Sequence, residues 1–68
     1  MNITKDINDL SSRVAFSLPV DFLTLMNEWI VLGRNVRKLT QAKDIEAGES
    51  NRLVNELKVI YDELQKIV

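Results

Sequence analysis

The chain has 68 residues, is 46% hydrophobic, and carries nine Lys+Arg against ten Asp+Glu, so its net charge is close to zero. This length allows one small domain, here taken as residues 1–68, and the absence of Cys and His excludes disulfides, thiolate zinc sites and histidine-based nucleophile systems. Since one core of this size supplies only about 3–5 kcal/mol, association with another subunit is the usual support that this composition leaves open.

The first predicted helix covers residues about 4–17. Thr4 is a suitable N-cap, and Asp6 would place negative charge in the first turn. The apolar residues then recur at helical spacing at Ile7, Leu10 and Val14. The alternation of apolar residues at 14, 16 and 18 would also suit a strand. Because the chain has no second strand-like segment for pairing, a helix is the preferred interpretation.

The second predicted helix follows Pro19, whose fixed φ and missing N–H suit a first helical position. Its apolar residues alternate spacings of three and four, which is typical of a helix–helix seam. These residues are Phe22, Leu25, Trp29, Leu32, Val36 and Leu39. Gly33 lies inside this helix, where glycine costs about 1 kcal/mol relative to alanine. Either the helix tolerates it, or another helix approaches closely, or the helix bends there.

The third predicted helix covers residues about 50–67. Gly48 is the expected left-handed residue that ends the preceding helix, and Ser50 is the expected N-cap of the next one. A wide apolar face follows, built on Leu53, Leu57, Ile60, Leu64 and Ile67. Both connections are short, so consecutive helices must fold back on one another. We therefore predict an all-α, antiparallel three-helix arrangement dominated by a hairpin (about 19–46 and 50–67).

The first half of the middle helix carries more apolar surface than one neighbouring helix can cover. At 100° per residue the seam forms one stripe, and Leu23, Met26 and Ile30 form a second stripe about 120° away. One stripe needs the third helix and the other needs the first. If the first helix covers the second stripe, no excess remains. If it does not, we expect an interface made of Phe16, Leu23, Met26, Trp29, Ile30 and Val31.

Beyond Gly33 the second stripe becomes polar and basic. Its members are Arg34, Arg37, Lys38 and Gln41, and no acidic residue lies between Trp29 and Lys43. Such a face can be simply solvated, can pair with Asp44, Glu46 and Glu49, can form the rim of an interface for an acidic protein, or can contact nucleic acid. The balanced net charge argues against nucleic acid as the main partner.

The sequence carries no pattern that predicts catalysis. Its two glycines are too far apart for a phosphate-binding loop, and the stretch from Asp44 to Asn51 departs from a calcium loop in its glycine and glutamate positions. We expect no enzyme activity, no cofactor and no metal. The acidic residues near the start of the chain and the short apolar runs predict a cytoplasmic protein without a membrane segment.

The leading functional hypothesis is therefore a small protein-binding module, an adaptor or an inhibitor, acting through helix–helix contacts and self-associating, most simply as a dimer. One alternative is a small dimeric DNA-binding regulator that uses the basic face. Another is a structural subunit or co-chaperone of a larger assembly. Helical pairs of this size occur among secretion co-chaperones, phage-encoded inhibitors and regulatory adaptors, but this is an analogy of shape without residue-level correspondence.

Overall fold

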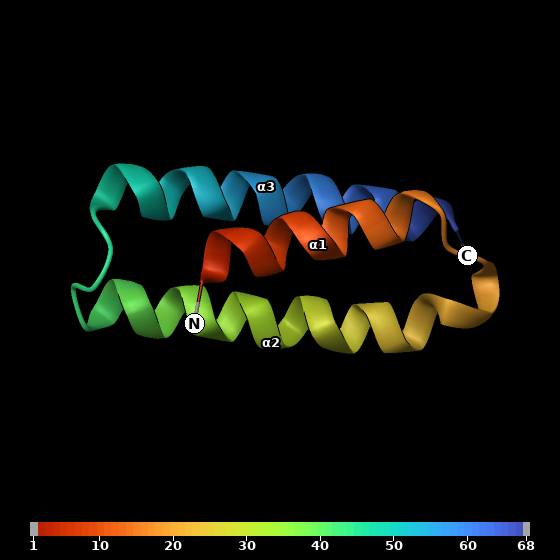
Figure 1. The fold of residues 1–68 in the computed structure, drawn as a ribbon, viewed down its shortest axis with the longest axis horizontal. Helices are drawn as coiled ribbons and strands as arrows, with labels where there is room; N and C mark the ends of the chain where they lie inside the picture. Colours follow the sequence, from red (N-terminus) through yellow and green to blue (C-terminus); the bar gives the residue numbers. More distant parts are fainter. Residues whose placement is uncertain (1, 68) are drawn as a thin grey trace.

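The computed structural model describes residues 2–67, which form three α-helices and one short 3₁₀ turn (Figure 1). They are α1 (Ile3–Ala15), η1 (Pro19–Asp21), α2 (Phe22–Gln41) and α3 (Ala47–Lys66). The helices α2 and α3 form an antiparallel hairpin, and α1 packs against both of them. The molecule is elongated, with extents of 36 × 16 × 16 Å. This architecture confirms the predicted all-α three-helix arrangement.

The start of α1 differs from the prediction. Asn2 is the N-cap, because its backbone is extended and its side-chain oxygen accepts a hydrogen bond of 3.2 Å from the Lys5 amide. Thr4 lies inside the helix instead, and its hydroxyl donates to the Glu49 carboxylate of α3 at 3.3 Å. The helix ends at Ala15, two residues earlier than predicted, with Phe16 as its C-cap.

The connection between α1 and α2 is fixed by a small reciprocal set of hydrogen bonds. The Leu18 amide donates to the Asp21 carboxylate at 3.2 Å, and the Asp21 amide donates to the Leu18 carbonyl at 2.9 Å. Pro19 opens this 3₁₀ turn, which leads into α2 without a break. The expectation that Pro19 starts the second helical segment is therefore confirmed.

The turn between α2 and α3 does not use the glycine that the sequence suggested. The helix α2 ends at Gln41, and Lys43 takes the left-handed conformation with φ of 59°. The Asp44 amide then donates to the Leu39 carbonyl at 2.9 Å, which satisfies one of the free carbonyls at the helix end. Gly48 has no positive φ and lies within the first turn of α3, so its predicted role is wrong.

Ser50 also has a different role from the predicted N-cap. It is buried inside α3, where its hydroxyl forms a hydrogen bond of 2.9 Å with the Thr40 hydroxyl of α2. The Thr40 hydroxyl also donates to the Val36 carbonyl at 2.7 Å. Glu46, in extended conformation, is the residue that precedes α3. The Thr40–Ser50 pair therefore joins the two arms of the hairpin near their turn.

The core is a single cluster to which all three helices contribute. Its buried apolar residues are Ile3, Ile7, Leu10 and Val14 of α1, Leu25, Leu32 and Val36 of α2, and Leu53, Leu57, Ile60 and Leu64 of α3. The remaining predicted seam residues of α2 are half-buried at the edge of this cluster, namely Phe22, Trp29 and Leu39. Within residues 2–67, no helix is both long enough and apolar enough to cross a membrane.

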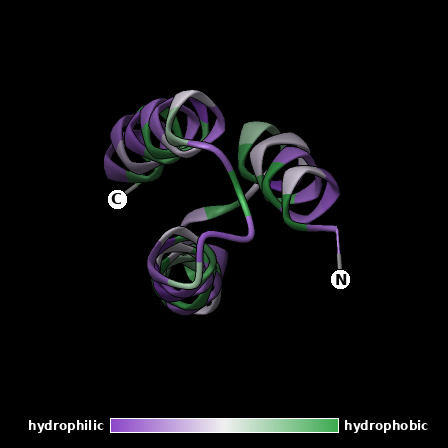
Figure 2. Cartoon of the chain, turned by 90° about the vertical axis from the view of Figure 1, so that its left-hand side faces the viewer, coloured by the Kyte–Doolittle hydropathy of each residue, from purple (hydrophilic) through white to green (hydrophobic). Residues whose placement is uncertain are grey.

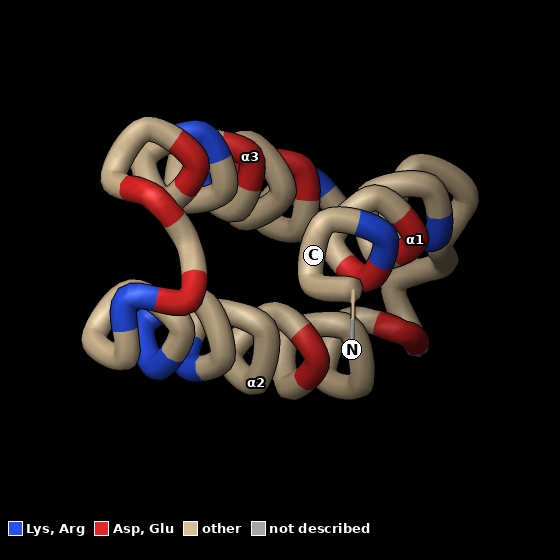
Figure 3. The backbone as a smooth tube through the Cα atoms, turned by 60° about the vertical axis from the view of Figure 1, so that its left-hand side comes forward, with Lys and Arg blue, Asp and Glu red and all other residues tan. Residues whose placement is uncertain are grey.

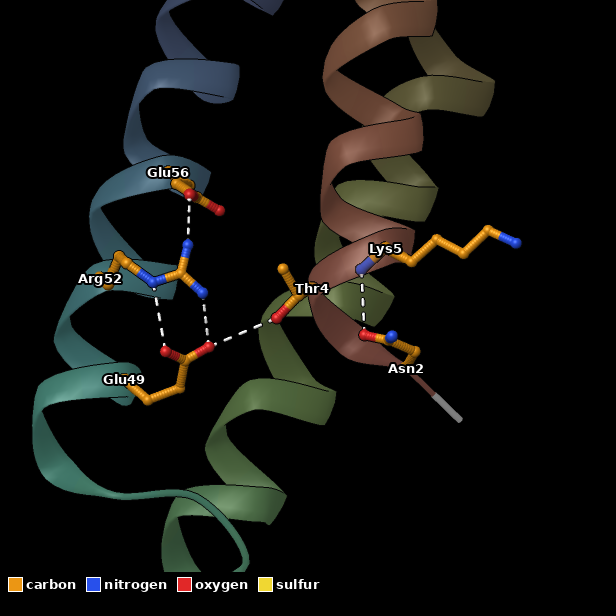
Figure 4. A network of polar contacts seen from close by, with 6 residues as sticks. All are labelled: Asn2, Thr4, Lys5, Glu49, Arg52 and Glu56. Carbon is orange, nitrogen blue, oxygen red and sulfur yellow. Dashed lines mark hydrogen bonds and ion pairs between the residues drawn. The ribbon is translucent and has the colours of Figure 1, made fainter.

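A surface network joins the first turns of α1 and α3 (Figure 4). The Arg52 guanidinium contacts Glu49 and also Glu56, the latter at 2.8 Å, while Thr4 reaches Glu49 from α1. The hydrogen bond from Arg52 lowers the pKa of Glu49 from its usual value. The hydrogen bond from Thr4 to Glu49 thus connects the start of α1 to the start of α3.

Candidate protein-interaction surface

The position of α1 decides which part of α2 stays uncovered. The Arg13 guanidinium forms an ion pair of 2.7 Å with the Glu28 carboxylate, which also raises the pKa of Arg13. The depression between the two helices is lined by Asp6, Asp9, Leu10 and Arg13 of α1 and by Asn27, Glu28, Val31 and Leu32 of α2. Seen end on, α1 lies on one side of the α2–α3 pair (Figure 2). The helix α1 therefore does not lie over Leu23 or Ile30.

The second apolar stripe of α2 remains accessible to solvent. Leu23 is 73% exposed and Ile30 is 39% exposed, whereas Met26 is half-buried and packs against the core. Together with Gly33 and Arg37, these residues succeed one another at spacings of three and four along one line of the helix. We call this line, Leu23, Met26, Ile30, Gly33 and Arg37, the α2 outer ridge. The alternative in which the first helix covers the stripe is wrong.

The other predicted interface residues do not belong to this ridge. The Trp29 indole N–H donates to the Leu57 carbonyl at 2.7 Å, and its ring lies 5.2 Å from that of Tyr61, so Trp29 is held against α3. Val31 is 52% exposed but borders the depression beside α1. Phe16, 89% exposed, lies at the end of α1. The six residues therefore do not form one contiguous patch.

Further exposed apolar residues gather at the connection between α1 and α2. Leu18 and Val20 are 65% and 82% exposed, and they follow Phe16 closely and precede Leu23. The sequence carried a signal for this exposure. Apolar residues alternate at positions 16, 18 and 20 around Pro19, and a spacing of two does not match the buried face of a helix. We call Phe16, Leu18, Val20 and Leu23 the apolar end of the molecule.

A shallow groove runs between α2 and α3 on the face away from α1. It is formed by two adjoining depressions, and none of their lining residues comes from α1. On the α2 side the lining residues are Trp29, Gly33, Val36, Arg37, Thr40 and Gln41. On the α3 side they are Ser50, Val54, Leu57, Lys58, Tyr61 and Asp62. Figure 2 shows no further element on this side of the hairpin within residues 2–67.

The basic residues of α2 are exposed and unpaired. Within the described part of the chain, Arg34, Arg37 and Lys38 form no ion pair. Figure 3 shows that Lys and Arg positions lie close together along the second half of α2. Glu49, one of their expected partners, contacts Arg52 instead. Gln41 lies one turn further along and lines the groove.

Among residues 2–67, no group of three or more His, Cys, Asp or Glu side chains is placed to hold a metal ion. The shifted pKa values of Arg13, Glu49 and Arg52 arise from ion pairs between or along helices, which stabilise the fold. Comparison with protein-family models, with curated proteins and with solved structures gives no match.

Proposed function

We propose that this chain is a non-enzymatic protein-binding module that acts through helix–helix contacts at the α2 outer ridge. The observation that carries the proposal is the exposure of Leu23 and Ile30 along a face of α2 that neither α1 nor α3 covers within residues 2–67. Half-buried Met26 lies between them and makes the apolar line continuous. Adjoining apolar residues at a protein surface are typical of an interface.

Association at this surface would also stabilise the small fold. Complete burial of an exposed leucine or isoleucine contributes about 1.5–3 kcal/mol, and the apolar end adds three more exposed side chains beside Leu23. A stable interface covers about 800 Å² on each partner, which this molecule can provide from its accessible surface of 4877 Å². A folded monomer that binds a partner gains stability by mass action.

The molar mass in solution, measured across concentrations, tests the self-associating form of the proposal. We expect a dimer that dissociates on dilution, and we expect Leu23→Asp to shift the protein to the monomer. Leu23 is the residue to change because it belongs to both the ridge and the apolar end, and at 73% exposure it contributes little to the core. Val59→Asp is the matched control. Val59 is similarly exposed, at 60%, but it lines a depression between α1 and α3, away from the α2 outer ridge.

Two outcomes would contradict the proposal in its general form. One is a native protein that stays monomeric at every concentration and whose Leu23→Asp variant captures the same host proteins as the native chain. The other is an equal effect of Leu23→Asp and Val59→Asp on association, since this would point to general surface hydrophobicity. Circular dichroism of both variants ensures that each remains helical.

A DNA-binding regulator is the second candidate, favoured by Arg34, Arg37 and Lys38, which form no ion pair with the residues that the structure describes. Binding to a random duplex at low salt, lost when these three residues are changed to Glu, would support it over the protein-binding module. A structural subunit or co-chaperone would use the same apolar ridge. The identity of a co-purifying protein separates that role from an adaptor or inhibitor.

A further inference from the structure

We infer that the groove between α2 and α3 holds an amphipathic helix of another protein, whose apolar side packs on Ile30, Trp29 and Tyr61 and whose acidic residues meet Arg37 and Lys58. This inference rests on the proposed function and names the class of partner. The groove borders the part of the α2 outer ridge that runs from Ile30 to Arg37, and Gly33 and Arg37 belong to both. The apolar end around Leu23 lies outside the groove.

Gly33 is the first reason to place a helix in this groove. It lies at the centre of the α2 wall, and a Cβ built there meets no atom within 4 Å. No neighbour within the described fold therefore requires glycine, although glycine in a helix interior is less stable than alanine. A bare backbone at the wall of an open groove lets a second helix approach more closely than any side chain would.

The apolar part of the groove lies on one side of Gly33. Trp29 and Tyr61 form a ring pair at 5.2 Å, and both residues line the groove. Ile30 is not a lining residue; it is 39% exposed and follows Trp29 on the α2 outer ridge, three positions before Gly33. Trp and Tyr are enriched in the centres of protein interfaces, where they supply large contact areas at a small entropy cost. An apolar helix face therefore fits this end.

The charges of the groove indicate an acidic partner. Arg37 lies on the α2 wall and Lys58 on the α3 wall, neither forms an ion pair within residues 2–67, and Asp62 is the acidic residue among the lining side chains. The depression between α1 and α2 has the opposite balance, with three carboxylates against Arg13. The cationic character thus belongs to the groove and not to the molecule as a whole.

The same charges argue against a second copy of this chain as the occupant. A contact between identical grooves would bring together two surfaces that each carry Arg37 and Lys58 against the single carboxylate of Asp62. Like charges across an interface are unfavourable, whereas a partner with carboxylates gains both attraction and a faster association rate. The occupant is therefore a different protein.

Two synthetic helical peptides of about 18 residues test the inference, since shorter isolated helices are marginally stable. Both carry the same leucine and alanine stripe, and they differ in having glutamate or lysine beside it. The single tryptophan of the chain, Trp29, lines the groove and reports binding through its fluorescence. We expect the glutamate peptide to bind at least about tenfold more tightly at low salt, with the difference shrinking as salt is added.

Two pairs of variants locate the site. Lys58→Glu should weaken binding of the glutamate peptide about tenfold, whereas Lys5→Glu, the same charge change at an exposed cation of α1, should leave it unchanged. Gly33→Leu should block the groove, whereas Gly33→Ala should weaken binding only slightly. All three positions are outside the buried core, and circular dichroism verifies the helical fold of each of the four variants.

The inference is overturned if both peptides bind equally, if neither changes the Trp29 fluorescence, or if Lys5→Glu weakens binding as much as Lys58→Glu. Tighter binding of a duplex DNA than of the glutamate peptide overturns it as well. These results are independent of the molar-mass test with Leu23→Asp, because Leu23 lies outside the groove lining. The proposed function can thus survive when the acidic-helix inference fails.

Discussion

Gly33→Ala should stabilise the fold, although it changes a residue in the middle of α2, on the wall of the groove. The position is helical, its φ is not positive, and an added Cβ meets no atom within 4 Å. The methyl group therefore causes no steric strain. Alanine also restricts the unfolded chain more than glycine does, which favours the folded state.

The size of the effect follows from helix propensity alone. Replacing glycine by alanine in a helix interior contributes about 1 kcal/mol. For a domain of 60–100 residues, this free energy raises the melting temperature by about 4–8 °C. Since the whole free energy of unfolding of such a small domain is only a few kcal/mol, the gain is a large fraction of it.

Thermal and urea unfolding followed by far-UV circular dichroism measure this change. Gly48→Ala is the matched control, because its Cβ also meets no atom within 4 Å but the residue lies in the first turn of α3. There, fewer helical hydrogen bonds depend on the residue, so we expect a smaller gain. A melting temperature of Gly33→Ala equal to or below that of the native protein would refute the reasoning. It would mean either that the added Cβ clashes with a neighbour or that the backbone at Gly33 is not regularly helical.

Three further substitutions test the packing and the surface network. Trp29→Phe removes the indole hydrogen bond to the Leu57 carbonyl and should lower the free energy of unfolding by about 1 kcal/mol in urea titrations; no change would mean that this bond is absent in solution. Leu53→Ala, at a position with no exposed surface, should cost about 2–5 kcal/mol and lower the urea midpoint sharply; a small shift would place Leu53 outside the core. Because Arg52 lowers the pKa of Glu49, the unfolded chain binds that proton more tightly than the folded one. This stabilisation is present above the unfolded pKa of about 4.3 and is lost as the pH falls through the lower folded value, so acid should lower the urea midpoint less in Glu49→Gln than in the native protein.

The helices and the core were predictable because periodic burial depends on residue spacing. Half of the α2 seam and the whole repeat from Leu53 to Leu64 lie in the core, and the rest of the seam lies at its edge. The helix ends were less predictable, since several residues can cap the same turn. Asn2 and Thr4 are both good N-caps, and the backbone conformation of the residue itself decides between them: Asn2 is extended, whereas Thr4 is helical.

The site was predictable only in part, because the periodicity of α2 does not state on which side α1 packs. The short connection through residues 16–21 allows α1 to lie on either side of α2. The ion pair between Arg13 and Glu28 marks the side that is chosen, and this choice leaves Leu23 and Ile30 exposed. Exposure of Leu18 and Val20 was missed because the connection was assigned to helices.

Gly33 and Lys43 each have a backbone conformation that is more favourable for another residue type. Glycine occupies a helical position that suits alanine, and lysine, with φ of 59°, occupies a left-handed position that suits glycine. Neither residue maximises the stability of this fold, so both offer a reserve of stability that substitutions can recover. Such a stabilised background would let the ridge and the groove be altered freely without loss of the fold.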